Sequence, residues 1–256
     1  MVSYVFKRYE LKYLLTRAQC EAVKSEISSR LSPDVFGKNT VQSLYLDTDD
    51  FRLVRESIEK PVFKEKLRLR CYNLNNCDKD IFIEMKRKYD GVVYKRRISC
   101  KENEVNEVLN ENPQTSQIGK ELDYFMRFYG TLSPKMLILY DREAFFDKES
   151  DLRVTFDENI RYRTDDLNFY TSLDGEELLS SDGVLMEIKT GSAIPLWLCK
   201  ILDKEKIIKQ SFSKYGTECQ PRIIRTSVLR RVFRLILCSA TAIYGCIMPF
   251  ARRVLA

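Results

Sequence analysis

The chain has 256 residues, 44% of them apolar, so it can form one large domain or two small ones around a sizeable core. Its 43 Lys and Arg against 37 Asp and Glu leave a net charge of +6, a mild excess whose distribution matters more than its size. Histidine is absent, which excludes Ser-His-Asp and Cys-His mechanisms, His-ligated metals and a histidine pH switch. Any chemistry therefore rests on carboxylates, lysines, arginines, hydroxyls or thiols.

The first half of the chain alternates between strand and helix patterns. Residues 4–15 (YVFKRYELKYLL) alternate charged and apolar side chains, as a strand does. Residues 16–31 have helical spacing, with Thr16 as the expected N-cap. We predict a strand over 41–49, a short helix over 49–60, and a strand over 63–73 whose Lys64, Lys66, Arg68 and Arg70 share one face.

We predict a β-hairpin over residues 81–99. Residues 81–89 (IFIEMKRKY) place Glu84, Lys86 and Lys88 on one face of a strand. The sequence YDG at 89–91 is a hairpin signal, and residues 92–99 (VVYKRRIS) are the expected partner strand. Residues 102–129 have a helical pattern that is interrupted at 110–117.

Three further strands are predicted towards the end of the chain, each with charge on alternate residues: 135–146, 152–163 and 185–191. A polar segment, KQSFSKYG, follows at 209–216. Eight cysteines are scattered beside apolar residues without a CxxC pair, which is typical of reduced core cysteines in a cytoplasmic protein. The first residues lack the apolar region of a signal peptide, so we expect no secretion signal.

Two interpretations account for the charged strand faces. Any one of them can be the solvated outer face of an antiparallel sheet. Taken together, however, several faces are rich in Lys and Arg with isolated Glu residues, and their opposite faces are not uniformly apolar. A closed barrel with a charged lumen fits this pattern better. The lysines and arginines that line such a lumen would repel one another unless a polyanion bound there. A few carboxylates among them would suit a divalent cation that bridges the protein to phosphate.

An ordered set of motifs carries a family resemblance: RYELKY, LYLDT, KLRLRCY, EMKRK, VYKRRIS, YDREAF, RVTFDENI, LMEIKTG and SFSKY. In this order they resemble the VTC domain, the catalytic domain of polyphosphate polymerases and a member of the triphosphate tunnel metalloenzyme superfamily. The resemblance runs from about Phe6 to Gly216. It implies an α+β fold, an eight-stranded antiparallel β-barrel with peripheral helices. It also implies transfer of the γ-phosphate of ATP onto polyphosphate.

The resemblance also implies roles for individual residues. The catalytic positions that match the family are Lys12, Arg68, Arg70, Lys86, Arg142 and Arg153. The matching substrate-binding positions are Lys95, Lys189, Ser213 and Lys214. Glu187 matches the metal-binding glutamate, and Glu10 is the expected second ligand of a Mn²⁺ or Mg²⁺ ion. Glu84 is expected either to temper the positive field or to aid the metal.

One departure bears on the activity. Hydrolases and cyclases of the superfamily carry ExExK on the first strand, whereas this chain has Arg8 at the first position of that motif. The change favours a polymerase over a hydrolase. The alternatives are a tunnel triphosphatase and a non-catalytic polyphosphate sensor. ATP and polyphosphate are the expected partners, and nucleic acid is not, because the pattern contains neither a recognition helix nor an aromatic platform.

The C-terminal tail lies beyond the resemblance. We expect a tunnel domain over residues 1–220 and a basic, apolar helical tail over 221–256. Residues 235–251 are uncharged and close to the length that spans a bilayer, with arginines on both sides. A helix packed on the barrel, a membrane anchor or interfacial helix, and a tail without a role remain alternatives. The expected location is accordingly the cytoplasm or the cytoplasmic face of a membrane.

Overall fold

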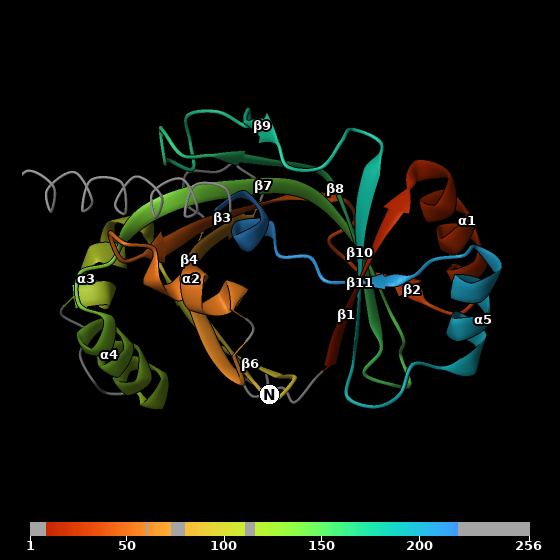
Figure 1. Cartoon of the computed structure of the whole chain (residues 1–256), viewed down its shortest axis with the longest axis horizontal. Helices are drawn as coiled ribbons and strands as arrows, with labels where there is room; N and C mark the ends of the chain where they lie inside the picture. Colours follow the sequence, from red (N-terminus) through yellow and green to blue (C-terminus); the bar gives the residue numbers. More distant parts are fainter. Residues whose placement is uncertain (1–8, 60, 73–79, 111–115, 220–256) are drawn as a thin grey trace, which may run out of the picture. The chain divides into compact units, whose positions relative to one another are not determined.

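The computed structural model describes residues 9–59, 61–72, 80–110 and 116–219 (Figure 1). The chain divides into two units, Met1–Thr217 and Glu218–Ala256, and the first contains the sheet and helices described below. No helix in the described ranges is long and apolar enough to cross a membrane. The apolar stretch 235–251 and Arg8 both lie outside the described residues.

The first unit is built on eight long strands. They are β1 (Tyr9–Thr16), β3 (Asn39–Asp47), β4 (Phe63–Tyr72), β5 (Ile81–Tyr89), β6 (Val92–Cys100), β7 (Ser133–Phe146), β8 (Arg153–Arg163) and β10 (Gly183–Thr190). Three short strands join them: β2 (Ser32–Pro33), β9 (Glu176–Glu177) and β11 (Lys209–Gln210). Every ladder is antiparallel.

The sheet follows the order β11-β1-β10-β8-β7-β3-β4-β5-β6, with β2 beside β7 and β9 beside β8. The predicted α+β class and the eight long antiparallel strands are confirmed. One detail of the predicted barrel differs, because no backbone ladder between described strands joins β6 to β1 or β11. The sheet is therefore open in its backbone hydrogen bonds, and side chains span the two edges instead.

The helices whose bounds lie within the described residues are α1 (Arg17–Ile27), α2 (Arg52–Ile58), α3 (Val105–Asn110), α4 (Gln117–Tyr129) and α5 (Leu196–Lys204), with a 3₁₀ turn at Glu102–Glu104. Helix α1 begins as predicted. The hydroxyl of Thr16 accepts from the Gln19 amide at 3.2 Å, and the Gln19 side chain accepts from the Thr16 amide at 3.0 Å. This reciprocal capping box satisfies two amides that the first turn leaves unpaired.

The predicted hairpin joins β5 to β6 through a two-residue turn. Asp90 and Gly91 both have positive φ angles, 43° and 82°. This is the conformation that a type I′ turn requires, and it matches the twist of the flanking strands. The turn fixes the register that pairs Lys86 with Lys95 and Glu84 with Arg97.

Two apolar cores lie on the outer face of the sheet. Helices α3 and α4 cover the part formed by β3–β6, and α1 and α5 cover the part formed by β1, β8 and β10 (Figure 1). Leu67, Leu69 and Met85 are buried in the first core, and Met186 and Ile188 in the second. Because side chains alternate along a strand, burying these residues outside turns their charged neighbours to the inner face.

Candidate functional site

The inner face of the sheet gathers the charged residues of at least six strands. On β4 it carries Lys66, Arg68 and Arg70, which alternate with buried Leu67 and Leu69. In register beside Arg68 lie Tyr45 of β3 and Glu84 of β5, and Arg97 of β6 continues this row. The alternation predicted from the sequence therefore produces one continuous charged surface.

Glu84 is the centre of the first cluster on this surface. Its side chain is fully buried and accepts from Arg68 Nε at 2.8 Å, from Arg97 Nε at 2.8 Å and from Lys95 Nζ at 3.2 Å. The Arg70 guanidinium lies 3.7 Å away. Burial alone would raise the pKa of the Glu84 carboxyl, but the charges of Arg70 and Arg68 outweigh burial and hold it well below its usual range. The Glu84 carboxylate is thus the shared counter-charge of four cations.

A second cluster surrounds Asp157 of β8 and Glu187 of β10. Asp157 is fully buried, accepts from Arg142 Nε at 2.6 Å and Nη2 at 2.7 Å, and pairs with Lys214. Glu187 lies 3.0–3.6 Å from the side-chain nitrogens of Lys189, Lys12, Arg142 and Lys214. The pKa of Glu187 is held well below its usual range, because Lys189 and Lys214 outweigh the effect of burial. Both carboxylates are therefore ionised.

Glu10 of β1 connects the two clusters across the open edge of the sheet. Its carboxylate accepts from Lys86 Nζ of β5 at 2.9 Å, although β1 and β5 are not neighbours in the sheet. Lys12 Nζ lies 3.4 Å from Glu10 and 3.5 Å from Glu187, and it donates to the Phe212 carbonyl at 3.0 Å. These contacts enclose the inner face with side chains where backbone ladders do not.

The segment 211–216 forms a further wall of this enclosure. Ser213 accepts from Lys66 Nζ of β4 at 3.0 Å. The Tyr215 hydroxyl donates to buried Asp47, at the end of β3, at 2.9 Å. The segment therefore runs from β11, beside β1, past Lys66 of β4 to the end of β3.

Burial and crowding shift the lysines of the inner face in different directions. The pKa of Lys12 is raised, because the carboxylates of Glu187 and Glu10 outweigh its burial. Burial lowers the pKa of Lys66 and of Lys95 to about 8. The pKa of Tyr45 falls to about 8 despite burial, because Arg68, Lys66 and Arg70 stabilise its phenolate. The inner face is thus electropositive enough to favour anions.

The structure brings most of the predicted site residues together on this face: Lys12, Arg68, Arg70, Lys86, Arg142, Lys95, Lys189, Ser213, Lys214, Glu187 and Glu10. Arg153 is the exception. Its guanidinium donates to Asp34 at 2.6 Å, and 42% of its side chain is exposed. Arg153 is in register with Lys189 of the second cluster, but it forms its ion pair with Asp34, after β2, and not with a carboxylate of either cluster.

Sequence reasoning missed several members of the site. Arg97 completes the Glu84 cluster, and Asp157 binds two of the predicted cations. Lys66 shares the inner face with Arg68 but was given no role. The KxR spacing of Lys95 and Arg97 was a usable signal, because both residues lie on the same face of one strand.

The predicted metal ligands, Glu187 and Glu10, lie on neighbouring strands, but the Lys12 ammonium contacts both of them. Across the described residues there is no group of three acidic or thiol side chains that could hold a metal by itself. The pair fits a Mg²⁺ or Mn²⁺ ion that takes its remaining oxygens from substrate phosphates and water, which is the usual mode for Mg²⁺.

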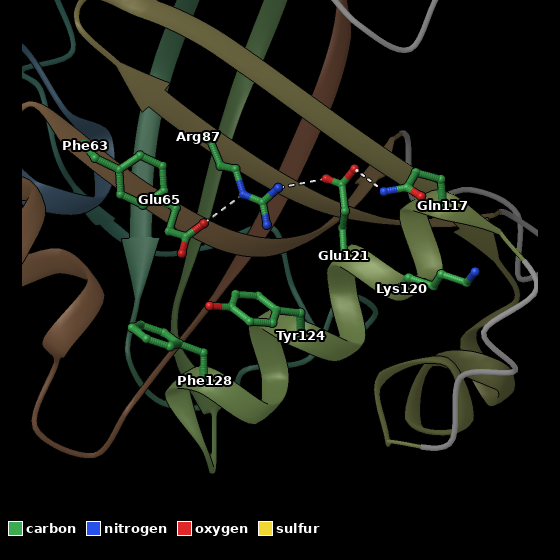
Figure 2. A pocket seen from close by; sticks show the side chains of 8 residues that line it. All are labelled: Phe63, Glu65, Arg87, Gln117, Lys120, Glu121, Tyr124 and Phe128. Carbon is green, nitrogen blue, oxygen red and sulfur yellow. Dashed lines mark hydrogen bonds and ion pairs between the residues drawn. The ribbon is translucent and has the colours of Figure 1, made fainter.

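A separate hollow of about 530 Å³ lies on the outer face, between α4 and the strands β4 and β5 (Figure 2). Phe63, Tyr124 and Phe128 line it with aromatic rings. Above them, Arg87 donates to Glu65 at 2.9 Å and to Glu121 at 2.7 Å (Figure 2). In this hollow each carboxylate meets an arginine, so its charges are matched, unlike those of the inner face.

Comparisons with known proteins agree on the fold. The family model of the VTC domain matches residues 7–221. No curated protein matches the chain at a significant level. A structure described as a candidate adenylate cyclase from Bacillus halodurans is similar with a TM-score of 0.52 and 15% identity, over 82% of this chain and 96% of the other. A second structure is described as a candidate adenylyl cyclase from Hippeastrum with a dominant triphosphatase activity. It is similar with a TM-score of 0.50 and 15% identity, over 82% of this chain and 94% of the other. At these identities the two structures show a shared fold.

Proposed function

The chain belongs to the VTC domain family, and on this premise we propose that it is a polyphosphate polymerase. In this proposal the inner face binds ATP and a polyphosphate chain and transfers the γ-phosphate of ATP onto the end of that chain. The observation that supports it is the imbalance of charge on the inner face. Its cations are Lys12, Lys66, Arg68, Arg70, Lys86, Lys95, Arg97, Arg142, Lys189 and Lys214, against the carboxylates Glu10, Glu84, Asp157 and Glu187.

A linear phosphate chain supplies the negative charge that this surface lacks. Phosphoryl transfer requires little covalent chemistry from a protein, because the rate depends on positioning and on stabilising charge at the transferring phosphate. Arg68 and Arg70 alternate along β4 and both point inward, about 7 Å apart along the strand. Their guanidinium groups can each hold two phosphate oxygens, and the lysines around them act as point charges.

A divalent cation would be held by Glu187 and Glu10 together with the phosphates. The chemistry supplied by such a cation would be partial neutralisation of the phosphate charge. The surrounding residues have a separate task. Lys12 contacts both carboxylates, and Arg142 and Lys214 are oriented by Asp157, so these cations are fixed in place before substrate binds. Such preorganisation lowers the cost of arranging charge during the reaction.

Product analysis tests this proposal. The purified protein is incubated with ATP and Mn²⁺ or Mg²⁺, and the products are separated by size. We expect phosphate chains that lengthen with time, released together with ADP. Free phosphate in place of chains would contradict the polymerase and identify a triphosphatase. Tight tripolyphosphate binding without turnover would contradict any enzyme activity and identify a polyphosphate sensor.

A further inference from the structure

Three lysines lie side by side on the inner face of β4, β5 and β6. Lys66 is directly opposite Lys86, and Lys86 is directly opposite Lys95. We call these residues the lysine row. Like charges that face one another across antiparallel strands destabilise the sheet. In this row Lys86 is compensated by Glu10 at 2.9 Å and Lys95 by Glu84 at 3.2 Å.

Lys66 is compensated differently from the other cations of the inner face. No described carboxylate forms an ion pair with it; its ammonium donates to the neutral Ser213 hydroxyl at 3.0 Å and lies 5.7 Å from the centre of the Tyr215 ring. The groups that face it are Tyr45 of β3, Lys12 of β1, Lys86 of β5 and Lys64 of its own strand. Apart from Tyr45, the charged groups with the largest effect on Lys66 are all cations.

The two arginines that follow Lys66 on the inner face of β4 are already close to a carboxylate. Arg68 donates to Glu84 at 2.8 Å, and Arg70 lies 3.7 Å from the same carboxylate. A phosphate group that approaches either arginine competes with Glu84. At Lys66 an anion meets an ammonium that forms no ion pair with a described carboxylate, so binding there displaces no carboxylate and relieves repulsion along the row.

We propose that Lys66, with the Ser213 hydroxyl beside it, binds a phosphate group of the substrate chain directly and supplies part of its affinity. This inference rests on the proposed function, and it adds a binding residue that the other cations of the inner face do not replace. A substrate chain that lies along β4 would contact Arg70, Arg68 and Lys66 in succession, since alternate residues of a strand share one face.

The state of Lys66 in the free protein supports this role. Burial, together with the charges of Lys12 and Lys86, lowers the pKa of its ammonium to about 8. A bound phosphate would raise that pKa again, because an adjacent anion favours the charged form. Binding above this pH should therefore be accompanied by proton uptake. Lys66 takes up part of these protons, and Tyr45 and Lys95, whose pKa values are also about 8, take up the rest.

Calorimetric titration with tripolyphosphate at about pH 8.5, in two buffers of different ionisation enthalpy, measures affinity and proton uptake together. We expect Lys66→Met to weaken binding by about ten- to hundredfold and to reduce proton uptake. We expect Lys66→Arg to retain most of the affinity. Lys120→Gln, which removes an exposed lysine from the outer hollow, is the matched control and should bind like the wild type.

Thermal melts of the same variants separate a binding role from a structural one. Removing an uncompensated ammonium should raise the melting temperature of free Lys66→Met by about 2–4 °C. Unchanged affinity and proton uptake in Lys66→Met, with normal wild-type binding, would overturn this inference and leave the proposed function intact. A Lys66→Met protein that melts lower and binds weakly would also overturn it, because Lys66 would then be structural. A wild-type protein that does not bind tripolyphosphate would overturn both.

Discussion

Lys86 and Arg87 are adjacent on β5, yet they belong to opposite kinds of surface. Arg87 points outward beneath α4, where it donates to Glu65 at 2.9 Å and to Glu121 at 2.7 Å. Arg96 also donates to Glu121, at 3.2 Å, so the arginines and carboxylates there are equal in number. On the inner face the single carboxylate of Glu84 is shared by four cations.

The difference shows how similar charges serve two purposes. Matched ion pairs on the outer face hold α4 on the sheet, because each partner satisfies the other. On the inner face cations outnumber carboxylates, and in the proposed function this excess of positive charge binds an anion from solution. The variants below are chosen to separate these two roles, beginning with the change that should have the largest effect.

Glu84→Gln should be the most destabilising change on the inner face. It leaves buried Arg70 and partly buried Arg68 and Arg97 without their anion, and breaking a buried ion pair typically costs about 3–5 kcal/mol of unfolding free energy. Urea unfolding measures this loss. Tripolyphosphate should restore more stability to the variant than to the wild type, because it replaces the missing charge. An unfolding midpoint equal to that of the wild type would contradict the role of Glu84 as the shared counter-charge.

Arg68→Ala should affect activity more than stability. It removes charge-assisted hydrogen bonds to phosphate worth about 1.5–3 kcal/mol, which lowers kcat/KM for ATP by about ten- to hundredfold. Glu84 keeps Lys95 and Arg97 as partners, so the fold should survive. Arg68→Lys should recover only part of the activity, since lysine cannot hold two oxygens at once. Unchanged turnover in Arg68→Ala would place the substrate elsewhere.

Arg87→Ala should show the reverse pattern. Buried Glu65 accepts from Arg87 and from the Tyr129 hydroxyl at 3.0 Å, and the variant leaves it only the hydroxyl. The change also removes the ion pair between Arg87 and Glu121 of α4. We expect a loss of about 1–3 kcal/mol of unfolding free energy, with turnover per folded molecule unchanged. Chemical unfolding and an ATP turnover assay on the same preparation provide both values. Lost turnover at wild-type stability would contradict the division between the two faces.

The pH dependence of stability should reflect the crowded lysines. The pKa of Lys66 is about 8 in the folded protein against 10.5 for an ordinary lysine, so between these values the unfolded chain binds more protons. The folded state therefore gains stability as pH rises through this range. Melting curves should show that the extra stability of Lys66→Met over the wild type shrinks from about pH 8 towards 10.5. A constant difference would mean that the Lys66 pKa is not depressed.

Local patterns in the sequence predicted much of the fold, and the family motifs pointed to most of the charged residues that the structure gathers on the inner face. The alternation in IFIEMKRKY placed Glu84 and Lys86 on one face, and the structure confirms that this face is the inner one. The turn at Asp90–Gly91 and the capping box at Thr16 were also readable, because they depend on residues close together in the chain.

Features that depend on distant partners could not be predicted. Arg153 has the right residue type and strand position, but its direction is set by Asp34, which lies 119 positions earlier in the chain. The special position of Lys66 depends on which strands pair with β4 and on its forming no ion pair with a described carboxylate, so alternation alone could not distinguish it from Arg68. The open edge of the sheet depends on ladders between strands, which spacing within one strand does not determine.

The most direct test of the account is one titration of tripolyphosphate into three proteins: the wild type, Arg68→Ala and Arg87→Ala. We expect Arg68→Ala to weaken binding by about tenfold or more, and Arg87→Ala to bind like the wild type despite its lower stability. Added salt should weaken the wild-type affinity, because charge–charge attraction is screened. Equal affinities in all three proteins, or a loss in Arg87→Ala alone, would contradict the claim that the unmatched cations of the inner face form the phosphate-binding site.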